Sequence, residues 1–384
     1  MMEIFEIFLF IFVGLYVFKT LLLLYGTTKL TYNRNKWQPN VSIVIVARNE
    51  EKNIGDCLES LTRLEYPGKK LEIILIDDRS TDKTGEYIRL FAEQYPNVKP
   101  IIIDDNPSDG LSGKASAISK GIEICEGTIV LMTDADCVLP EQWVSEYVSY
   151  FVEDVGLVAG ITLLDEAEDE TPLFGKIQST DWAYLLTIGA GAVGIGVPLS
   201  CVGNNFAFRK QVYDEVGGFK NLGFSLTEDS SFVRAIIQQK KWKVRYTIDP
   251  SLLVQSKPMN SFKSFYHQRK RWATGSFLVS FFGKLLIIIA ILTHILIPIS
   301  FFIHTNWSIP IYSIALILLS DFFVLLRTTW LLKRLDLLKY FPLFELFYFF
   351  YTTLYSVIMP FNGRIEWKDV VYDMKKGEVC NGCS

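Results

Sequence analysis

The sequence predicts an α/β domain built on a mostly parallel sheet and flanked at both ends by transmembrane helices. Three observations support this fold class. Half of the 384 residues are hydrophobic, and the apolar and aromatic excess collects at the two ends of the chain. Between about residues 40 and 250, short apolar runs alternate with amphipathic ones, which is typical of strands alternating with helices. Acidic residues follow several of the apolar runs directly.

The first 28 residues predict one membrane span. The run Ile4–Tyr25 is almost wholly apolar, and about 22 helical residues are enough to cross a ~30 Å hydrocarbon core. No small-residue cleavage pattern follows it, so a cleaved signal peptide is the weaker alternative. Acidic residues precede the run and basic residues follow it (Lys29, Arg34 and Lys36). The positive-inside rule therefore places the amino terminus outside and the next domain in the cytosol.

Residues 38–275 predict the cytosolic domain. Short runs rich in β-branched residues predict four strands, and amphipathic segments between them predict helices. The strands are Val41–Val46, Leu71–Ile76, Lys99–Ile103 and Thr128–Met132, and the helices are Glu50–Leu64, Thr81–Gln94 and Ala115–Glu126. Because ligands of such sheets bind beyond the carboxyl ends of the strands, we expect a nucleotide site there.

Residues 276–362 predict two to three further spans, followed by a tail over 363–384. The apolar runs are Leu285–Ile303, Ile309–Leu326 and Tyr340–Phe361. The loop after the first run carries no Lys or Arg, whereas the loop after the second carries three, so these two runs predict a hairpin that dips outward. The third run is either a full crossing, which we slightly favour, or a re-entrant segment that keeps the basic tail in the cytosol.

Polar residues at the ends of the first two strands predict contacts to a nucleotide. Asp77 and Asp78 follow the second strand, and Asn49 and Glu50 follow the first. Helix capping by the following Ser80-Thr81-Asp82 is the structural alternative, but it does not explain two adjacent acids. We therefore expect Asp78 to accept a hydrogen bond from a base or a ribose.

Asp134-Ala135-Asp136 is the strongest single motif. Two carboxylates after a buried strand can share a Mg²⁺ or Mn²⁺ ion that is already bound to phosphates. Further along, Asp229 in Thr227-Glu228-Asp229 precedes a predicted helix over Ser230–Gln239. It is interpreted as a catalytic base, a helix cap, or both. Gly203-Asn204-Asn205 is interpreted either as a plain turn or as part of an acceptor site.

The segment Gln268-Arg269-Lys270-Arg271-Trp272 lies shortly before the second apolar region. On a helix, Gln268, Arg271 and Trp272 share one face. Arg271 can bind a diphosphate in a forked geometry, and Trp272 offers a flat face to a sugar or a lipid. The alternative is an anchor at the bilayer surface, which accounts for Arg269 and Lys270 but not for Gln268.

Composition excludes several other classes of function. A net charge of −4 argues against nucleic acid as a partner. The six cysteines show no repeated spacing and there are three histidines, so a zinc site is not expected, and Cys380 and Cys383 form one isolated Cys-x-x-Cys. The middle domain fits a reducing cytosol.

The order of these motifs resembles the membrane-bound inverting glycosyltransferases of family 2, which have a GT-A fold. The resemblance covers about residues 40–275, and the single amino-terminal span is most similar to ceramide and other lipid glucosyltransferases. Polysaccharide synthases resemble the chain more distantly, because they generally carry more spans. The resemblance implies that Asp78 binds uridine, that Asp134 and Asp136 bind the diphosphate and its metal, and that Asp229 is the base. It also implies donor roles for Asn49, Glu50, Asp77, Lys114, Gln268 and Arg271, and acceptor roles for Glu228 and Trp272.

The function implied is transfer of a sugar from a UDP-hexose or UDP-N-acetylhexosamine to a lipid or lipid-linked acceptor. We expect this at the cytosolic face of a bacterial or archaeal plasma membrane. Two alternatives stay open at this point. One is a processive polysaccharide synthase, and the other is a non-catalytic membrane protein that binds nucleotide sugars.

Overall fold

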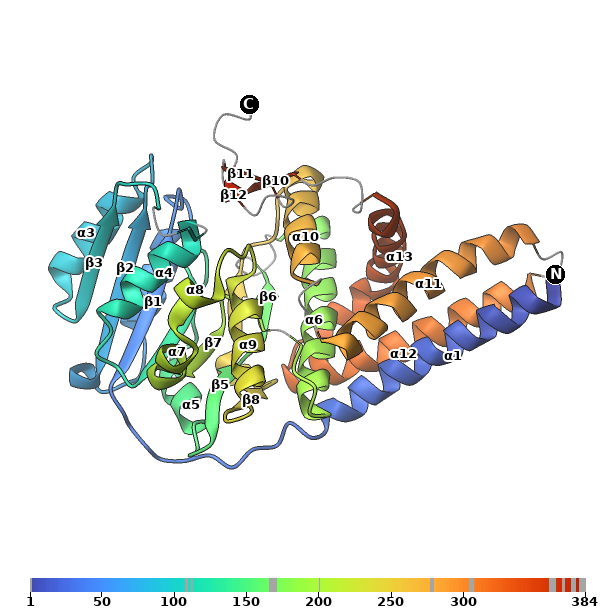
Figure 1. The fold of residues 1–384 in the computed structure, drawn as a ribbon, viewed down its shortest axis with the longest axis horizontal. Helices are drawn as coiled ribbons and strands as arrows, with labels where there is room; N and C mark the ends of the chain where they lie inside the picture. Colours follow the sequence, from blue (N-terminus) through green and yellow to red (C-terminus); the bar gives the residue numbers. More distant parts are fainter. Residues whose placement is uncertain are drawn as a thin grey trace.

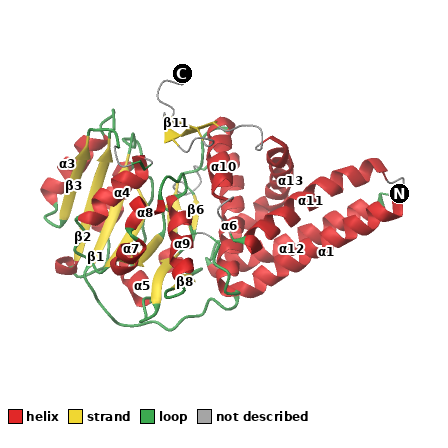
Figure 2. Cartoon of the chain, in the orientation of Figure 1, coloured by secondary structure: helices red, strands yellow, loops and turns green. Residues whose placement is uncertain are grey.

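The computed structural model describes residues 2–107, 110–111, 113–165, 171–199, 201–276, 280–303, 307–358, 364–367, 370–373 and 378–379. Cys380, Cys383 and most of the predicted loop at 304–307 lie outside these ranges. The chain forms an α/β domain at one end and a group of long helices at the other (Figure 1). Figure 2 shows that the large sheet lies wholly in the first part.

A seven-stranded sheet forms the centre of the α/β domain, in the order β3-β2-β1-β4-β7-β5-β8. Neighbouring strands are parallel except at β7, which is antiparallel to both β4 and β5. A separate parallel pair is formed by β6 and β9. The strands are β1 Val41–Ala47, β2 Leu71–Asp78, β3 Val98–Ile103, β4 Ile129–Asp134, β5 Val155–Ala159, β6 Thr162–Leu164, β7 Phe206–Arg209, β8 Lys243–Tyr246 and β9 Val254–Ser256.

Helices cover both faces of the sheet, so strands β1, β2 and β4 are buried almost throughout. The helices are α2 Ile54–Thr62, α3 Thr84–Gln94, α4 Gly113–Glu123, α5 Trp143–Ser149, α7 Lys210–Val216, α8 Gly218–Leu222 and α9 Glu228–Gln239. Helix α2 begins four residues later than predicted. The backbone N–H groups of Asn49 and Glu50 instead donate to Ser80 and Thr84, which ties the end of β1 to the loop after β2.

The register of the parallel strands brings the predicted polar residues to one edge. Ala47 at the end of β1 pairs with Asp77 of β2, and Val46 pairs with Asp134 of β4. The three strands therefore end at the same level. Polar residues that are far apart in the sequence therefore lie together at this edge of the sheet.

Three helices are long and apolar enough to cross a membrane: α1 Met2–Thr27, α11 Phe281–Ile303 and α12 Ser308–Leu331. They run alongside one another and away from the α/β domain, with the amino terminus at the far tip (Figure 1). Helix α13, Phe341–Ile358, is not among the candidate spans in the described part of the chain. The tail contains three short antiparallel strands that the sequence did not predict: β10 Arg364–Trp367, β11 Val370–Asp373 and β12 Glu378–Val379.

Two helices lie between the α/β domain and the candidate membrane helices: α6 Leu173–Gly194 and α10 Phe262–Ser276 (Figure 1). Helix α6 packs on α1 with the two backbones in contact, because a Cβ atom at Gly26, Gly191 or Gly194 would collide with the backbone of the other helix. The side chains of Tyr16 and Tyr184 both donate hydrogen bonds of 2.7 Å to Asp321 of α12. Helix α6 is thus fixed to the candidate membrane helices α1 and α12 on one side.

Candidate active site

A cavity of about 650 Å³ lies between the carboxyl ends of the central strands and helices α6 and α10. Segments far apart in the sequence contribute its walls. Ten of the twelve residues predicted from the sequence line it: Glu50, Asp78, Lys114, Asp134, Asp136, Glu228, Asp229, Gln268, Arg271 and Trp272. The structure therefore brings the acidic sites and the basic, aromatic segment into one pocket.

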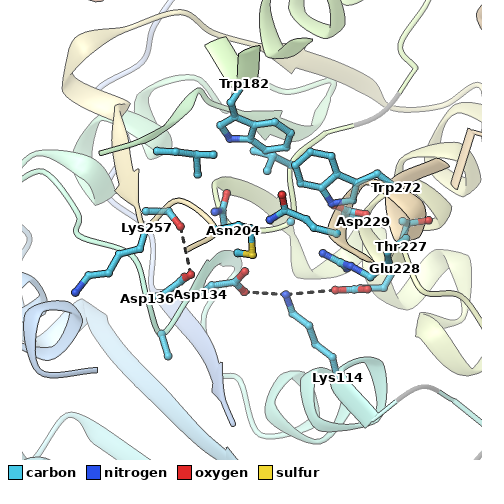
Figure 3. Close-up of a pocket in the computed structure, with 18 of the residues that line it drawn as sticks. Lys114, Asp134, Asp136, Trp182, Asn204, Thr227, Glu228, Asp229, Lys257 and Trp272 are labelled. Carbon is cyan, nitrogen blue, oxygen red and sulfur yellow. Dashed lines mark hydrogen bonds and ion pairs between the residues drawn. The ribbon is translucent and has the colours of Figure 1, made fainter. Parts of the chain in front are cut away.

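Lys114 connects two acidic sites across the cavity (Figure 3). Its Nζ atom lies 2.8 Å from Asp134 Oδ1 and 3.5 Å from Glu228 Oε1. Burial alone would lower the pKa of Lys114, but the two carboxylates outweigh burial and hold this pKa above its usual value. The two carboxylates therefore converge on a point where a positive charge is stabilised.

Asp134 and Asp136 offer hard oxygen donors of the kind that Mg²⁺ and Mn²⁺ prefer. Asp136 Oδ2 accepts a hydrogen bond of 3.3 Å from Ser256, and Asp134 Oδ1 accepts the one from Lys114. Among the described residues, no three His, Cys, Asp or Glu side chains converge as a metal site. The two carboxylates would thus hold a divalent cation only in part, and a bound phosphate would have to supply further ligands.

Asp229 lies in the first turn of α9, where its Oδ1 atom accepts a hydrogen bond of 2.7 Å from the N–H of Ser230. Burial and the neighbouring charge of Glu228 raise the pKa of Asp229 to about 6. A Cβ atom at Gly203 would lie 2.9 Å from Asp229 Oδ2, so the loop approaches this carboxylate as closely as a glycine allows. A carboxylate with a pKa near neutrality is suited to general-base catalysis.

Helix α10 presents Gln268, Arg271 and Trp272 to the cavity. The side-chain oxygen of Gln268 is buried without a hydrogen-bond partner in the described structure, and Arg271 Nη1 donates to the carbonyl oxygen of Leu226 at 3.1 Å. Trp272 stacks on Trp182 of α6, with ring centroids 4.3 Å apart and planes 20° apart. One face of the Trp272 ring is therefore covered by protein, and the two indoles together line the cavity.

The anchor interpretation is wrong for Arg269 and Lys270. Both are buried, at 5% and 3% exposure, so neither reaches a bilayer surface. Arg269 forms an ion pair with Asp181 of α6, and Tyr351 of α13 donates a hydrogen bond of 2.8 Å to the same carboxylate. Arg269 also lies over the Trp272 ring, 4.3 Å from its centroid. These contacts connect α10, α6 and α13.

Asn49 and Asp77, for which the sequence predicts contacts to the donor, lie outside the cavity lining. Successive residues of a strand point to opposite faces, so Asp77 points away from its neighbour Asp78 and accepts a hydrogen bond from the N–H of Ser80. Asn49 Oδ1 accepts from the N–H of Thr81 at 2.8 Å. Both side chains hold the loop after β2 in place.

Asp78 does reach the cavity, and it is held there by the next residue. Its two oxygens accept hydrogen bonds of 2.8 and 3.0 Å from the guanidinium group of Arg79. Arg79 has a φ of 60°, in the left-handed region that is uncommon for residues with a side chain. This sharp turn ends β2 at the cavity.

Sequence reasoning missed the wall that α6 contributes. Trp182, Leu185, Leu186 and Gly189 line the cavity at helical spacing i, i+3, i+4 and i+7. That spacing was the only signal, and it does not distinguish a ligand site from an ordinary core face. Arg48 was also missed, although it follows β1 directly and its buried Nε atom has no hydrogen-bond partner in the described structure.

Comparison with known proteins agrees with this geometry. The sequence model described as glycosyl transferase family 21 matches residues 7–380. The chain belongs to this family. The predicted recognition of a glycosyltransferase is thereby confirmed, with family 21 in place of the family 2 to which the motifs were compared.

Curated relatives match the family 21 chain over about two thirds of its length. YdaM of Bacillus subtilis, named as a probable glycosyltransferase, is 28% identical over 66% of this chain and 62% of its own length. The beta-monoglucosyldiacylglycerol synthase of Synechocystis is 30% identical over 62% of this chain and 48% of its own length. The chain thus spans between about half and three fifths of these relatives.

A solved structure confirms the fold. The mannosyltransferase PcManGT from Pyrobaculum calidifontis, in complex with GDP-Man and Mn²⁺, superposes with a TM-score of 0.55 at 16% identity. The match covers 88% of this chain and 87% of that one. The GT-A fold predicted from the sequence is therefore shown.

Proposed function

We propose that this protein is a membrane-bound inverting glycosyltransferase that transfers one sugar from a UDP-sugar to the hydroxyl group of a lipid. The observation that supports it best is the composition of the cavity at the carboxyl ends of the central strands. Paired carboxylates at the strand ends face a basic helix, and the carboxylate of Asp229, with a raised pKa, lines the same cavity as helices α6 and α10. The named activity of the Synechocystis relative is consistent with a lipid acceptor.

The sheet side of the cavity would bind the donor. Asp78 would accept a hydrogen bond from the uridine, and Gln268 and Arg271 would contact the diphosphate. Asp134 and Asp136 would hold a Mg²⁺ or Mn²⁺ ion, and this ion would neutralise charge on the diphosphate. Lys114 lies within reach of the same phosphates once it leaves Asp134, and Glu50 lines the same part of the cavity.

Asp229 would act as the base. Its carboxylate takes the proton from the acceptor hydroxyl, and the oxygen attacks the anomeric carbon from the side opposite the diphosphate. The bond from this carbon to the diphosphate oxygen breaks, and UDP leaves with the electron pair. Attack from the opposite side inverts the configuration. Glu228 and Trp272 lie beside Asp229, on the side where the acceptor would enter.

The topology that fits this reaction places the cavity at the cytosolic side of a bacterial or archaeal plasma membrane. UDP-sugars and divalent cations are then supplied from the cytosol. The basic residues that follow α1 and α12 support this orientation. In this arrangement α1, α11 and α12 cross the membrane, and α13 packs beside α6 and α11.

The variant Asp229→Asn distinguishes an enzyme from a non-catalytic binder. The amide keeps the shape of the side chain but removes its basicity, so transfer should fall by roughly 10²-fold or more while UDP affinity stays within about twofold. Asp214→Asn, on the exposed surface of α7, is the matched control and should keep its activity. Ordinary turnover in Asp229→Asn would contradict this role and point to Glu228. Absence of transfer in the wild type would favour the binder.

A further inference from the structure

The wall that α6 contributes differs from the rest of the cavity in its chemistry. The described lining residues from Leu164 to Val202 include Trp182, Leu185, Leu186 and Gly189, and none of these lining residues carries a charge. The charged lining residues lie on the other segments. A nucleotide diphosphate therefore has no partner along α6, and this part of the cavity suits an apolar group.

Gly189 keeps this wall open. A glycine inside a helix is destabilising by roughly 0.5–1 kcal/mol relative to alanine, so its presence at a cavity wall calls for a reason. A Cβ atom at Gly189 would contact only Tyr246, 4.0 Å away. Close backbone packing therefore does not require this glycine, in contrast to Gly191 on the same helix. Without a side chain at Gly189, the space between α6 and the Tyr246 ring stays open.

Tyr246 provides an independent sign of a ligand at the same place. The residue is 1% exposed and lines the cavity, yet its hydroxyl group has no hydrogen-bond partner in the described structure. A buried hydroxyl without a partner costs about 1–3 kcal/mol. A ligand oxygen beside Gly189 would satisfy it.

Apolar side chains connect α6 next to this wall with the candidate membrane helices. Ile188, the neighbour of Gly189, packs against a small cluster formed by Leu23 of α1 and Leu286 of α11. Leu199 and Phe282 pack on the same cluster. Helix α11 begins at Phe281, whose side chain is 84% exposed, on a segment that a bilayer would cover. An acceptor chain that leaves the cavity along α6 would therefore meet apolar side chains of α1 and α11.

We infer that Leu185, Leu186 and Gly189 of α6 form the passage for the hydrocarbon chain of the acceptor, that Gly189 sets its width, and that the Tyr246 hydroxyl binds an acceptor oxygen next to the reacting hydroxyl. This inference rests on the proposed transfer to a lipid. It assigns specificity to residues that lie outside every motif of the sequence. The passage runs between the cavity and the start of α11.

Photolabelling tests the passage without requiring turnover. The protein is placed in lipid nanodiscs that contain a diacylglycerol with a diazirine in one acyl chain, and labelled residues are identified by mass spectrometry. We expect label on Leu185, Leu186 or Gly189 in the wild type. In Gly189→Phe this label should fall by about fivefold or more, because the ring fills the passage. Label on the exposed residues Phe8 and Leu15 of α1 should stay the same.

The same variants are then compared in transfer from a panel of UDP-sugars to lipids extracted from the host membrane. Gly189→Phe should lose about tenfold or more of its transfer while UDP affinity, which also reports folding, stays within about twofold. Gly55→Phe is the matched control, because Gly55 is an exposed helical glycine with open space around it. Tyr246→Phe should raise the KM for the lipid by about three- to tenfold and change kcat less.

The outcomes separate the two proposals. Label on the α6 wall without any glycolipid product would contradict the proposed transfer and support the passage. Glycolipid formation that Gly189→Phe leaves unchanged, or an α6 wall that takes no label, would overturn the passage and leave the proposed function standing.

Discussion

The two sides of the cavity hold their charges in different ways. On the sheet side, Lys114 pairs with Asp134 at 2.8 Å, and both side chains are 33% exposed. On the helix side, the guanidinium group of Arg269 pairs with Asp181, and the two side chains are 5% and 0% exposed. The first pair faces the space that a ligand would enter, and the second is sealed between three helices.

This difference indicates a division of roles. An ion pair that water reaches is worth little, so a phosphate or a cation can replace it at small cost. A buried ion pair has lost its hydration, so removing one partner leaves the other charge without compensation. The sheet side can therefore reorganise when the donor binds, whereas the helix side keeps Gln268, Arg271 and Trp272 in place.

Breaking the buried pair should have the largest effect on stability. Arg269→Met leaves the Asp181 carboxylate buried without its partner and should lower the free energy of unfolding by about 3–5 kcal/mol. Thermal or denaturant unfolding in detergent measures this. Arg63→Met removes an exposed pair with Glu59 on α2 and should cost less than about 1 kcal/mol. Equal effects of the two variants would remove the contrast between the two sides.

The forked contact of Arg271 with the diphosphate is tested by Arg271→Lys. A lysine keeps the charge but loses the planar pair of donors, so donor use should fall by one to two orders of magnitude, or roughly 1.4–2.7 kcal/mol. Kinetics at varied UDP-sugar concentration measure the loss. Membrane insertion should not change, and Arg234→Lys on the exposed face of α9 is the control. Full activity in Arg271→Lys would show that charge alone suffices at this position.

The pKa of Asp229 predicts how transfer depends on pH. Burial and Glu228 raise this pKa to about 6, and the base acts only when it is deprotonated. Activity should be full above about pH 7 and should fall as pH decreases through 6, to about a tenth at pH 5. Glu228→Gln removes the like charge, so the pH at which activity falls to half should decrease. A rate that stays constant down to pH 5 would exclude a base with this pKa.

Removal of divalent cations tests the role of Asp134 and Asp136. UDP should bind about tenfold more weakly or worse in the presence of a chelator, a difference of at least about 1.4 kcal/mol. Isothermal titration of UDP with and without chelator measures this difference, and it should vanish in Asp136→Asn. Equal affinities in the wild type would contradict the metal role.

The sequence predicted the sheet side of the site well because strand geometry leaves little freedom there. A buried apolar run that is followed by acidic residues identifies a strand. It also identifies the edge of the sheet at which those acidic residues lie, as at Asp78 and Asp134. The exceptions differ: Asp77 lies on the opposite face of β2 from Asp78, and Asn49 lies beyond the end of β1 in a loop, with a φ of 53°. A shift of one residue reverses that face, and the loop hydrogen bonds that decide it cannot be read from spacing.

The helix side was predicted only in part, because its partners are distant in sequence. The motif on α10 gave Gln268, Arg271 and Trp272, but nothing near it indicates that Arg269 pairs with Asp181, 88 residues earlier. From Trp182 onward, helix α6 is apolar nearly all round, so its cavity face, its face toward α1 and its face toward α12 look alike in the sequence. Tertiary packing alone distinguishes them.

The central claim is that one cavity joins a nucleotide-sugar site to a lipid acceptor. Its most direct test is mass spectrometry of lipids after membranes that contain the protein are incubated with a panel of UDP-sugars. The account predicts a lipid whose mass increases by one sugar residue, formed by the wild type and lost in Asp229→Asn. A ladder of masses would contradict single transfer and favour a polysaccharide synthase. Absence of any sugar-bearing lipid would contradict the lipid acceptor itself.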